Sequence, residues 1–116
     1  MRKDVNIYIQ DIWKSVLMIE SYIEDLTSQE FLANRLTMDA VERRLEIIGE
    51  ASKQVDYETR ERYPDIPWSD MARLRDVISH KYNRLNPRRI WVIATTEIPD
   101  LKDHLRPVIE IIGDGQ

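Results

Sequence analysis

The chain has 116 residues, of which 42% are hydrophobic and 33% charged, and it contains no cysteine. This length predicts a single domain over residues 1–116, and the composition is typical of a globular rather than a disordered protein. A chain without cysteine has no disulfide, thiolate zinc site or cysteine nucleophile. No apolar run reaches the ~18 residues of a membrane span and the charged N-terminus does not resemble a signal peptide, so we expect a cytoplasmic protein without membrane contact.

The net charge of −4 is unevenly distributed along the chain. Between residues 73 and 89, six Lys or Arg residues stand against Asp76 alone, whereas the segments on either side are acidic. Such a basic segment could bind a phosphate-bearing partner, or it could be a helix end that docks on the acidic remainder of the protein. The charge pattern favours neither explanation over the other.

Apolar residues recur at steps of three and four, which predicts helices throughout the chain. An irregularity is expected near residues 34–37, a short polar segment over 56–64, and a helix cap at Ser69. Together these patterns predict an all-α, up-and-down bundle of four or five helices. The helices are expected over about residues 3–26, 28–55, 69–83 and 87–97, and a last helix, which Pro99 starts or kinks, ends near Gly113.

Gly49 lies in the middle of the second predicted helix, where glycine costs about 1 kcal/mol relative to alanine. Close approach of another helix, within the chain or across a dimer, would explain this glycine. The same helix carries Glu42, Glu46 and Glu50 at steps of four. This acidic row could face the basic segment, contact a partner or bind a cation. We favour a solvated face, because three carboxylates over two turns indicate a metal only weakly.

The segment from Arg73 to Tyr82 places a guanidinium, an imidazole and a phenol near the end of one predicted helix. Asp76 stands four residues before His80, so it could accept a hydrogen bond from the ring and orient it. Arg75 and His80 converge only if the helix ends or distorts there, or if a second chain supplies one of them. A histidine can move the proton of an RNA 2′-hydroxyl, and an arginine can stabilise phosphate charge, without a metal.

Each of these side chains also has a structural interpretation, as a fold-stabilising histidine or a solvated arginine. The other histidine, His104, is expected on an exposed helical face. Acid–base cleavage works best with two proton-transfer groups, which two copies of His80 in a symmetric dimer would supply.

Three segments occur in an order that resembles the HEPN superfamily and its HepT-like toxin branch. The resemblance covers nearly the whole chain and implies an α-helical bundle, usually a homodimer, with the motif near a cleft between protomers. The three segments are residues 39–51, Pro67-Trp68 with Arg75-x4-His80-x-Tyr82, and Asn86-Pro87 through Leu101.

The resemblance implies a metal-independent ribonuclease that is the toxin of a toxin–antitoxin pair. The partner would be a small MNT-type nucleotidyltransferase antitoxin, which in this branch can transfer AMP from ATP to the motif tyrosine. Carried over, Arg75 and His80 are catalytic, Asp76 is auxiliary and Tyr82 accepts AMP. We expect no metal and no other cofactor. The residues expected to bind RNA phosphates are Arg73, Lys81 and Arg84.

The alternative is a non-catalytic helical module that binds a nucleotidyltransferase or a nucleotide. In that case His80 would only stabilise the fold. The overall acidity mildly favours this alternative, whereas the basic segment with all three motif residues favours the ribonuclease.

Overall fold

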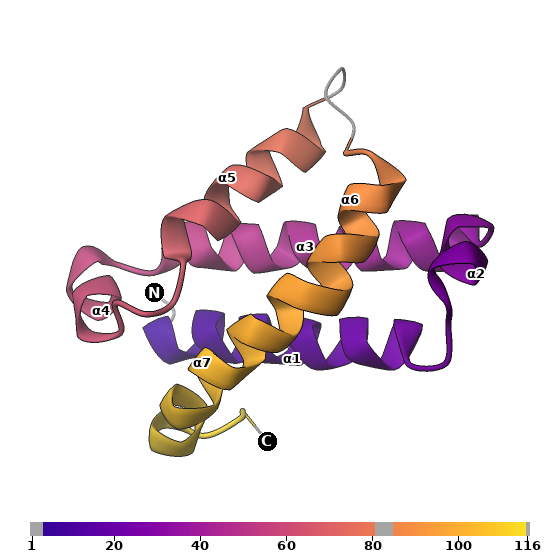
Figure 1. The fold of residues 1–116 in the computed structure, drawn as a ribbon. Helices are drawn as coiled ribbons and strands as arrows, with labels where there is room; N and C mark the ends of the chain where they lie inside the picture. The colour runs from indigo at the N-terminus through magenta and orange to yellow at the C-terminus, as the bar shows by residue number, and fades with distance from the viewer. Residues whose placement is uncertain (1–3, 81–84, 116) are drawn as a thin grey trace.

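The computed structural model describes residues 4–80 and 85–115, and helices are the only regular structure among them (Figure 1). Two short helices lie in the connections, α2 (Ser28–Leu32) and α4 (Tyr57–Arg62). The predicted all-α bundle is therefore confirmed. Its four long units are α1 (Val5–Ile23), α3 (Arg35–Gln54), α5 (Trp68–Ser79) and a continuous run of α6 (Pro87–Val92), the π-helical η1 (Ile93–Glu97) and α7 (Ile98–Ile112).

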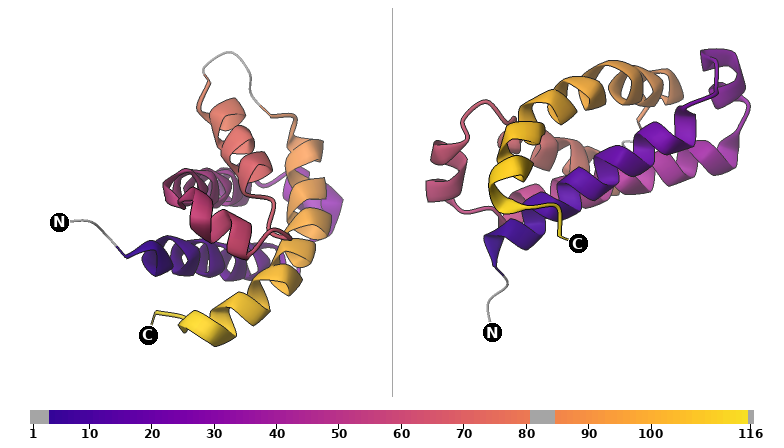
Figure 2. Two further views of the ribbon diagram at one scale, coloured as in Figure 1. Left: turned by 90° about the vertical axis from the view of Figure 1, so that its left-hand side faces the viewer. Right: turned by 90° about the horizontal axis from the view of Figure 1, so that it is seen from below.

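The helices α1 and α3 lie side by side and antiparallel, and α5 and the α6–α7 run cross them (Figures 1 and 2). The central helix is α3, which packs against α1 on one side and against α5 on another. The α7 helix packs against α1. Since α5 and the α6–α7 run diverge from one another, a groove lies between them, with residues of α3 in its floor.

The core is formed by the apolar faces of α1, α3 and the α6–α7 run. The predicted spacing in α1 is confirmed, because four of its apolar side chains are fully buried: Ile9, Ile12, Val16 and Ile19. In α5 only Trp68 and Met71 are buried, and both lie in the first turn. Among the helices that the structure describes, none has the length and hydropathy needed to cross a membrane.

Two predictions about the first half of the chain need correction. The second predicted helix is two helices, because the chain breaks at the expected irregularity and Asn34 caps α3 by accepting a bond from the Thr37 backbone N–H (3.0 Å). Residues 56–64 contain α4 rather than only a polar segment. Asp56 caps this helix by accepting from the Thr59 backbone N–H (2.8 Å).

The boundaries of α5 also differ from the prediction. The helix begins at Trp68, so Ser69 lies inside it, and Pro67 occupies the cap position without a side-chain bond. It ends at Ser79 with His80 as its cap, and residues 81–83 of the predicted helix lie outside the described residues. The end of α5 therefore falls immediately before His80.

Pro99 does not start a separate helix. The chain stays helical from α6 into α7 through η1, a π-helical turn that precedes the proline. Proline lacks an N–H and clashes with the preceding turn, and a π-turn is one way for a helix to accommodate this. Gly113 ends α7 near the predicted position, with a φ of 87° that favours glycine.

Candidate functional site

Gly49 is a point of very close contact between α3 and α5. A Cβ atom at this position would lie 2.1 Å from the Arg75 Cβ and 2.6 Å from the Met71 carbonyl oxygen. Only a residue without a side chain fits there. The predicted close approach is confirmed, and it occurs within the chain. The glycine thus sets the backbone of Arg75 directly against α3.

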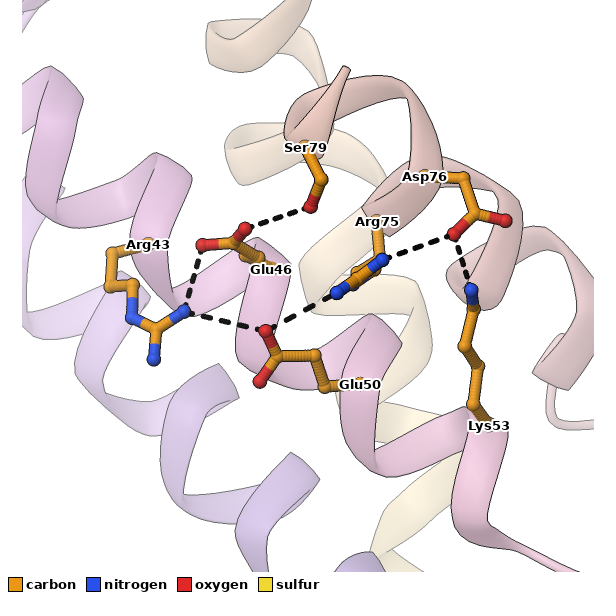
Figure 3. Close-up of polar contacts among 7 residues, drawn as sticks. All are labelled: Arg43, Glu46, Glu50, Lys53, Arg75, Asp76 and Ser79. Carbon is orange, nitrogen blue, oxygen red and sulfur yellow. Dashed lines mark hydrogen bonds and ion pairs between the residues drawn. The ribbon is translucent and has the colours of Figure 1, made fainter. Parts of the chain in front are cut away.

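The Arg75 guanidinium lies between acidic side chains of the two helices (Figure 3). Its Nε is 3.9 Å from Glu50 Oε1, and its Nη1 is 3.4 Å from Asp76 Oδ1. The side chain is 33% exposed, and its Nε is buried without a hydrogen-bond acceptor among the described residues. Buried donors of this kind are rare in folded proteins. Part of the guanidinium remains accessible to a phosphate oxygen.

Glu46 holds the last residue of α5. Its Oε2 accepts a hydrogen bond from Ser79 Oγ (2.8 Å), and its Oε1 accepts one from Arg43 Nη1 (2.7 Å). The bond from Arg43, followed by the bond from Ser79, holds the pKa of Glu46 below its ordinary value. The expectation of a solvated acidic row is therefore wrong for Glu46 and Glu50, because both side chains face α5.

His80 directly follows the last residue of α5. Its backbone is extended (φ −79°, ψ 122°), its N–H donates to the Val77 carbonyl (3.3 Å), and the residue is exposed. A helix that ends between Arg75 and His80 is one of the conditions under which the two side chains can converge. The structure meets this condition.

Asp76 lies four residues before His80, the residue that caps the end of α5, and the predicted hydrogen bond from the His80 ring stays a prediction. Asp76 is held by Lys53 of α3, to which it is hydrogen-bonded, and by Arg75. The Lys53 ammonium is the main reason that the pKa of Asp76 is lowered. Asp76 therefore connects Arg75 to α3.

Of the expected phosphate-binding residues, Arg73 lies in the described part of the chain. Arg73 pairs with Asp70 and lines the groove of about 510 Å³ between α5 and the α6–α7 run. Two residues apart on an α-helix, side chains point about 200° apart, so Arg73 and Arg75 lie on different faces. The other two expected phosphate-binding residues, Lys81 and Arg84, lie outside the described part of the chain, and so does Tyr82, the expected AMP acceptor.

Three arginines of the basic segment pair with carboxylates. Arg73 pairs with Asp70, Arg75 approaches Glu50, and Arg89 lies 2.6 Å from Glu97. The carboxylate beside Arg75 belongs to Glu50 of another helix, α3. At Arg75 the basic segment therefore docks on an acidic part of the protein, as the second explanation of the charge pattern expects. The phosphate-binding explanation stays open for the accessible guanidinium atoms.

The second histidine lies on α7, on an exposed face as predicted. His104 Nδ1 is 2.9 Å from the Asp100 carbonyl oxygen, and this hydrogen bond is the main reason that the pKa of His104 is raised. Over residues 4–80 and 85–115, no group of three or more acidic or histidine side chains could hold a metal ion. The candidate site thus consists of Arg75 in α5 and His80, which directly follows the last residue of this helix.

Comparison with known proteins identifies a family and several relatives that this chain resembles. A family model described as Ribonuclease HepT-like matches residues 12–108, which include Gly49, Arg75 and His80. The chain is 41% identical, over 95% of its own length, to a Methanocaldococcus jannaschii protein named "Gamma-glutamylcyclotransferase and putative RNase", of which it spans only 50%. No solved structure matches.

Two further relatives match over nearly their whole length. One is a "Putative RNase" of the same organism, 38% identical over 99% of this chain and 96% of that protein. The other is the "Probable ribonuclease HepT" of Thermococcus cleftensis, 37% identical over 88% of this chain and 93% of that protein. Both relatives are thus single units of about the extent of this chain.

Proposed function

Because the chain belongs to the Ribonuclease HepT-like family, we propose that it is a ribonuclease whose centre is formed by Arg75 and His80. One observation carries this assignment: α5 ends between these two residues, with Arg75 fixed against α3 and His80 exposed just beyond the helix. The names of the relatives support ribonuclease activity. Asp76 has an auxiliary role through its contact with Arg75.

The proposed reaction uses the RNA's own nucleophile and no metal. A base removes the proton from a 2′-hydroxyl, whose oxygen attacks the adjacent phosphorus; the bond to the 5′-oxygen breaks and that oxygen takes up a proton. His80 performs one of these proton transfers, and Arg75 stabilises the charge on the phosphate. A homodimer supplies a second copy of His80 for the other transfer, and Arg73, Lys81 and Arg84 bind neighbouring phosphates.

We further propose that this ribonuclease is the cytoplasmic toxin of a toxin–antitoxin pair. Its partner is an MNT-type nucleotidyltransferase antitoxin that transfers AMP to the Tyr82 hydroxyl and so occupies the place of the substrate phosphate. The proximity of Tyr82 to His80 in the sequence supports this form of inhibition. A Tyr82→Phe variant that the antitoxin still silences by transferring AMP would contradict the proposal.

The test is incubation of the purified protein with total RNA in excess chelator, beside a His80→Ala variant. An intact-mass spectrum excludes a preparation that already carries AMP. We expect wild-type cleavage and at least a ~100-fold slower reaction of the variant, the loss typical of a missing acid–base group. Equal rates, or no cleavage by an unmodified and folded wild type, would overturn the proposal.

One observation favours the binding module as a second candidate. The Arg75 side chain is only 33% exposed and its guanidinium faces Glu50 and Asp76, as in a purely structural arginine. A wild-type protein that cleaves no RNA but binds a nucleotidyltransferase in a pull-down would support this candidate. Toxicity in cells that disappears with His80→Ala, while the fold survives, would contradict it.

A further inference from the structure

The last turns of α5 are attached to the rest of the fold by partly buried apolar side chains and by polar contacts. The two buried side chains of this helix, Trp68 and Met71, lie in its first turn. Toward the other end Leu74 and Ile78 are only partly buried against the core, Val77 is 40% exposed, and Ser79 and His80 are exposed. Polar contacts therefore add to these apolar contacts in orienting the helix end, where the proposed chemistry occurs.

These polar contacts come from one face of α3 (Figure 3). Glu46 accepts from Ser79, while Glu50, one turn further along, faces Arg75. Arg43 links the two carboxylates, since its Nη1 lies 2.7 Å from Glu46 Oε1 and 3.5 Å from Glu50 Oε1. Arg43 thus holds the carboxylates of Glu46 and Glu50 in place beside α5.

On the basis of the proposed ribonuclease, we infer that Glu46 is a positioning residue that fixes the end of α5 and thereby the place of His80. Glu46 acts through Ser79, the residue that precedes His80, and it is not assigned any contact with RNA. The Ser79 hydroxyl is held at 2.8 Å, and the accepting carboxylate is itself held by Arg43. Because a catalytic group misplaced by about 1 Å can cost up to ~100-fold in rate, a loose helix end would slow the chemistry.

The experiment compares RNA cleavage by the full-length wild type with two variants that break this contact from either side, Glu46→Ala and Ser79→Ala. We expect each to lower kcat by about tenfold with KM within about twofold, since RNA binding is retained while His80 is misplaced. The double variant should be no slower than either single one, because the same contact is lost. Glu46→Gln keeps an oxygen that can accept from Ser79 and should recover kcat to within about threefold of wild type.

Asp39→Ala is the matched control. It removes another carboxylate of α3, one paired with Arg35 on the same helix (3.1 Å), and should leave kcat unchanged. Hydrogen exchange of the backbone amides 76–80 provides a readout that does not depend on activity. Exchange should accelerate in Glu46→Ala and Ser79→Ala but not in Asp39→Ala.

The outcomes separate this inference from the proposed function. A wild type that cleaves RNA together with a Glu46→Ala variant of full kcat would overturn the positioning role alone. Unchanged exchange at residues 76–80 would overturn it as well. An unmodified wild type without ribonuclease activity would overturn the proposed function. The contact between Glu46 and Ser79 would then have a structural role only, and the positioning role would fall as well.

Discussion

The two helices that flank α3, α1 and α5, are held in contrasting ways. Of the residues of α1, Ile9, Ile12, Val16 and Ile19 are fully buried, so this helix is fixed along its length by apolar contacts. In α5 the buried side chains are confined to the first turn, and the remainder is held by the partly buried Leu74 and Ile78, by a close contact at Gly49 and by polar side chains (Figure 3).

This contrast indicates that α1 contributes mainly to stability, whereas the end of α5 serves the candidate site. Apolar burial contributes several kcal/mol per large side chain, whereas exposed ion pairs contribute about 0–1 kcal/mol each. Substitutions on the polar contact of α5 can therefore disturb the candidate site without unfolding the protein. Elements with few buried contacts are also those that open most easily.

The largest effect on stability is expected from the α1 side. Ile12→Ala removes a fully buried side chain and should lower the free energy of unfolding by about 2–5 kcal/mol, measured by urea denaturation. A loss below 1 kcal/mol would contradict the assignment of this helix to the core. The matched substitution Val77→Ala on α5, at a side chain 40% exposed, should cost much less.

Gly49→Ala should have the next largest effect. It should change both the stability of the fold and the position of α5. At an open position in a helix, alanine would add about 1 kcal/mol of stability. Here its Cβ meets Arg75 and Met71, so we expect a loss of about 1–3 kcal/mol and a displaced α5. Urea denaturation and RNA cleavage of the same variant measure both effects. A gain of stability would show that the helices can separate freely.

A smaller effect is expected from the charge of Glu46. Its pKa is lower in the folded than in the unfolded protein, so its contribution to stability is complete above its ordinary value of 4.5 and is lost as the pH falls through the folded value. The cations that face it are Arg43 and Arg75, and the like charge beside it is Glu50. The stability difference between wild type and Glu46→Gln should therefore shrink below about pH 4. A difference that stays constant from pH 7 to pH 3 would contradict this.

The smallest effect is expected at His104, which lies outside the site. Its raised pKa predicts the opposite pH dependence, with a contribution present below its ordinary value of 6.5 and lost as the pH rises through the folded value. Urea denaturation of wild type and His104→Ala at pH 5 and pH 9 should show a difference only at the lower pH. A variant equally affected at both pH values would contradict the raised pKa of His104.

The sequence predicts much of this fold because long apolar periodicity has few structural solutions. The burial of α1 and the end of α7 at Gly113 follow from local patterns. The short helix α4 has no apolar stripe, so periodicity does not reveal it, although Asp56 is a recognisable cap. The end of α5 is less predictable, because the apolar spacing continues beyond Ser79.

The candidate site shows where sequence reasoning stops. The motif residues Arg75 and His80 are identified by their resemblance to the family's motif, but the residues that support them are not, because contacts between α3 and α5 depend on how the two helices cross. One signal was available. Gly49 predicts a helix crossing, and a crossing there brings the neighbouring acids Glu46 and Glu50 against the basic helix.

The two histidines of this chain allow the most direct test of the central claim, that His80 at the end of α5 is part of a ribonuclease centre. The measurement is the rate of RNA cleavage in excess chelator by unmodified wild type, His80→Ala and His104→Ala. We predict that the His80 variant loses at least about 100-fold, while the His104 variant stays within about twofold of wild type. Equal rates for all three proteins would contradict the account.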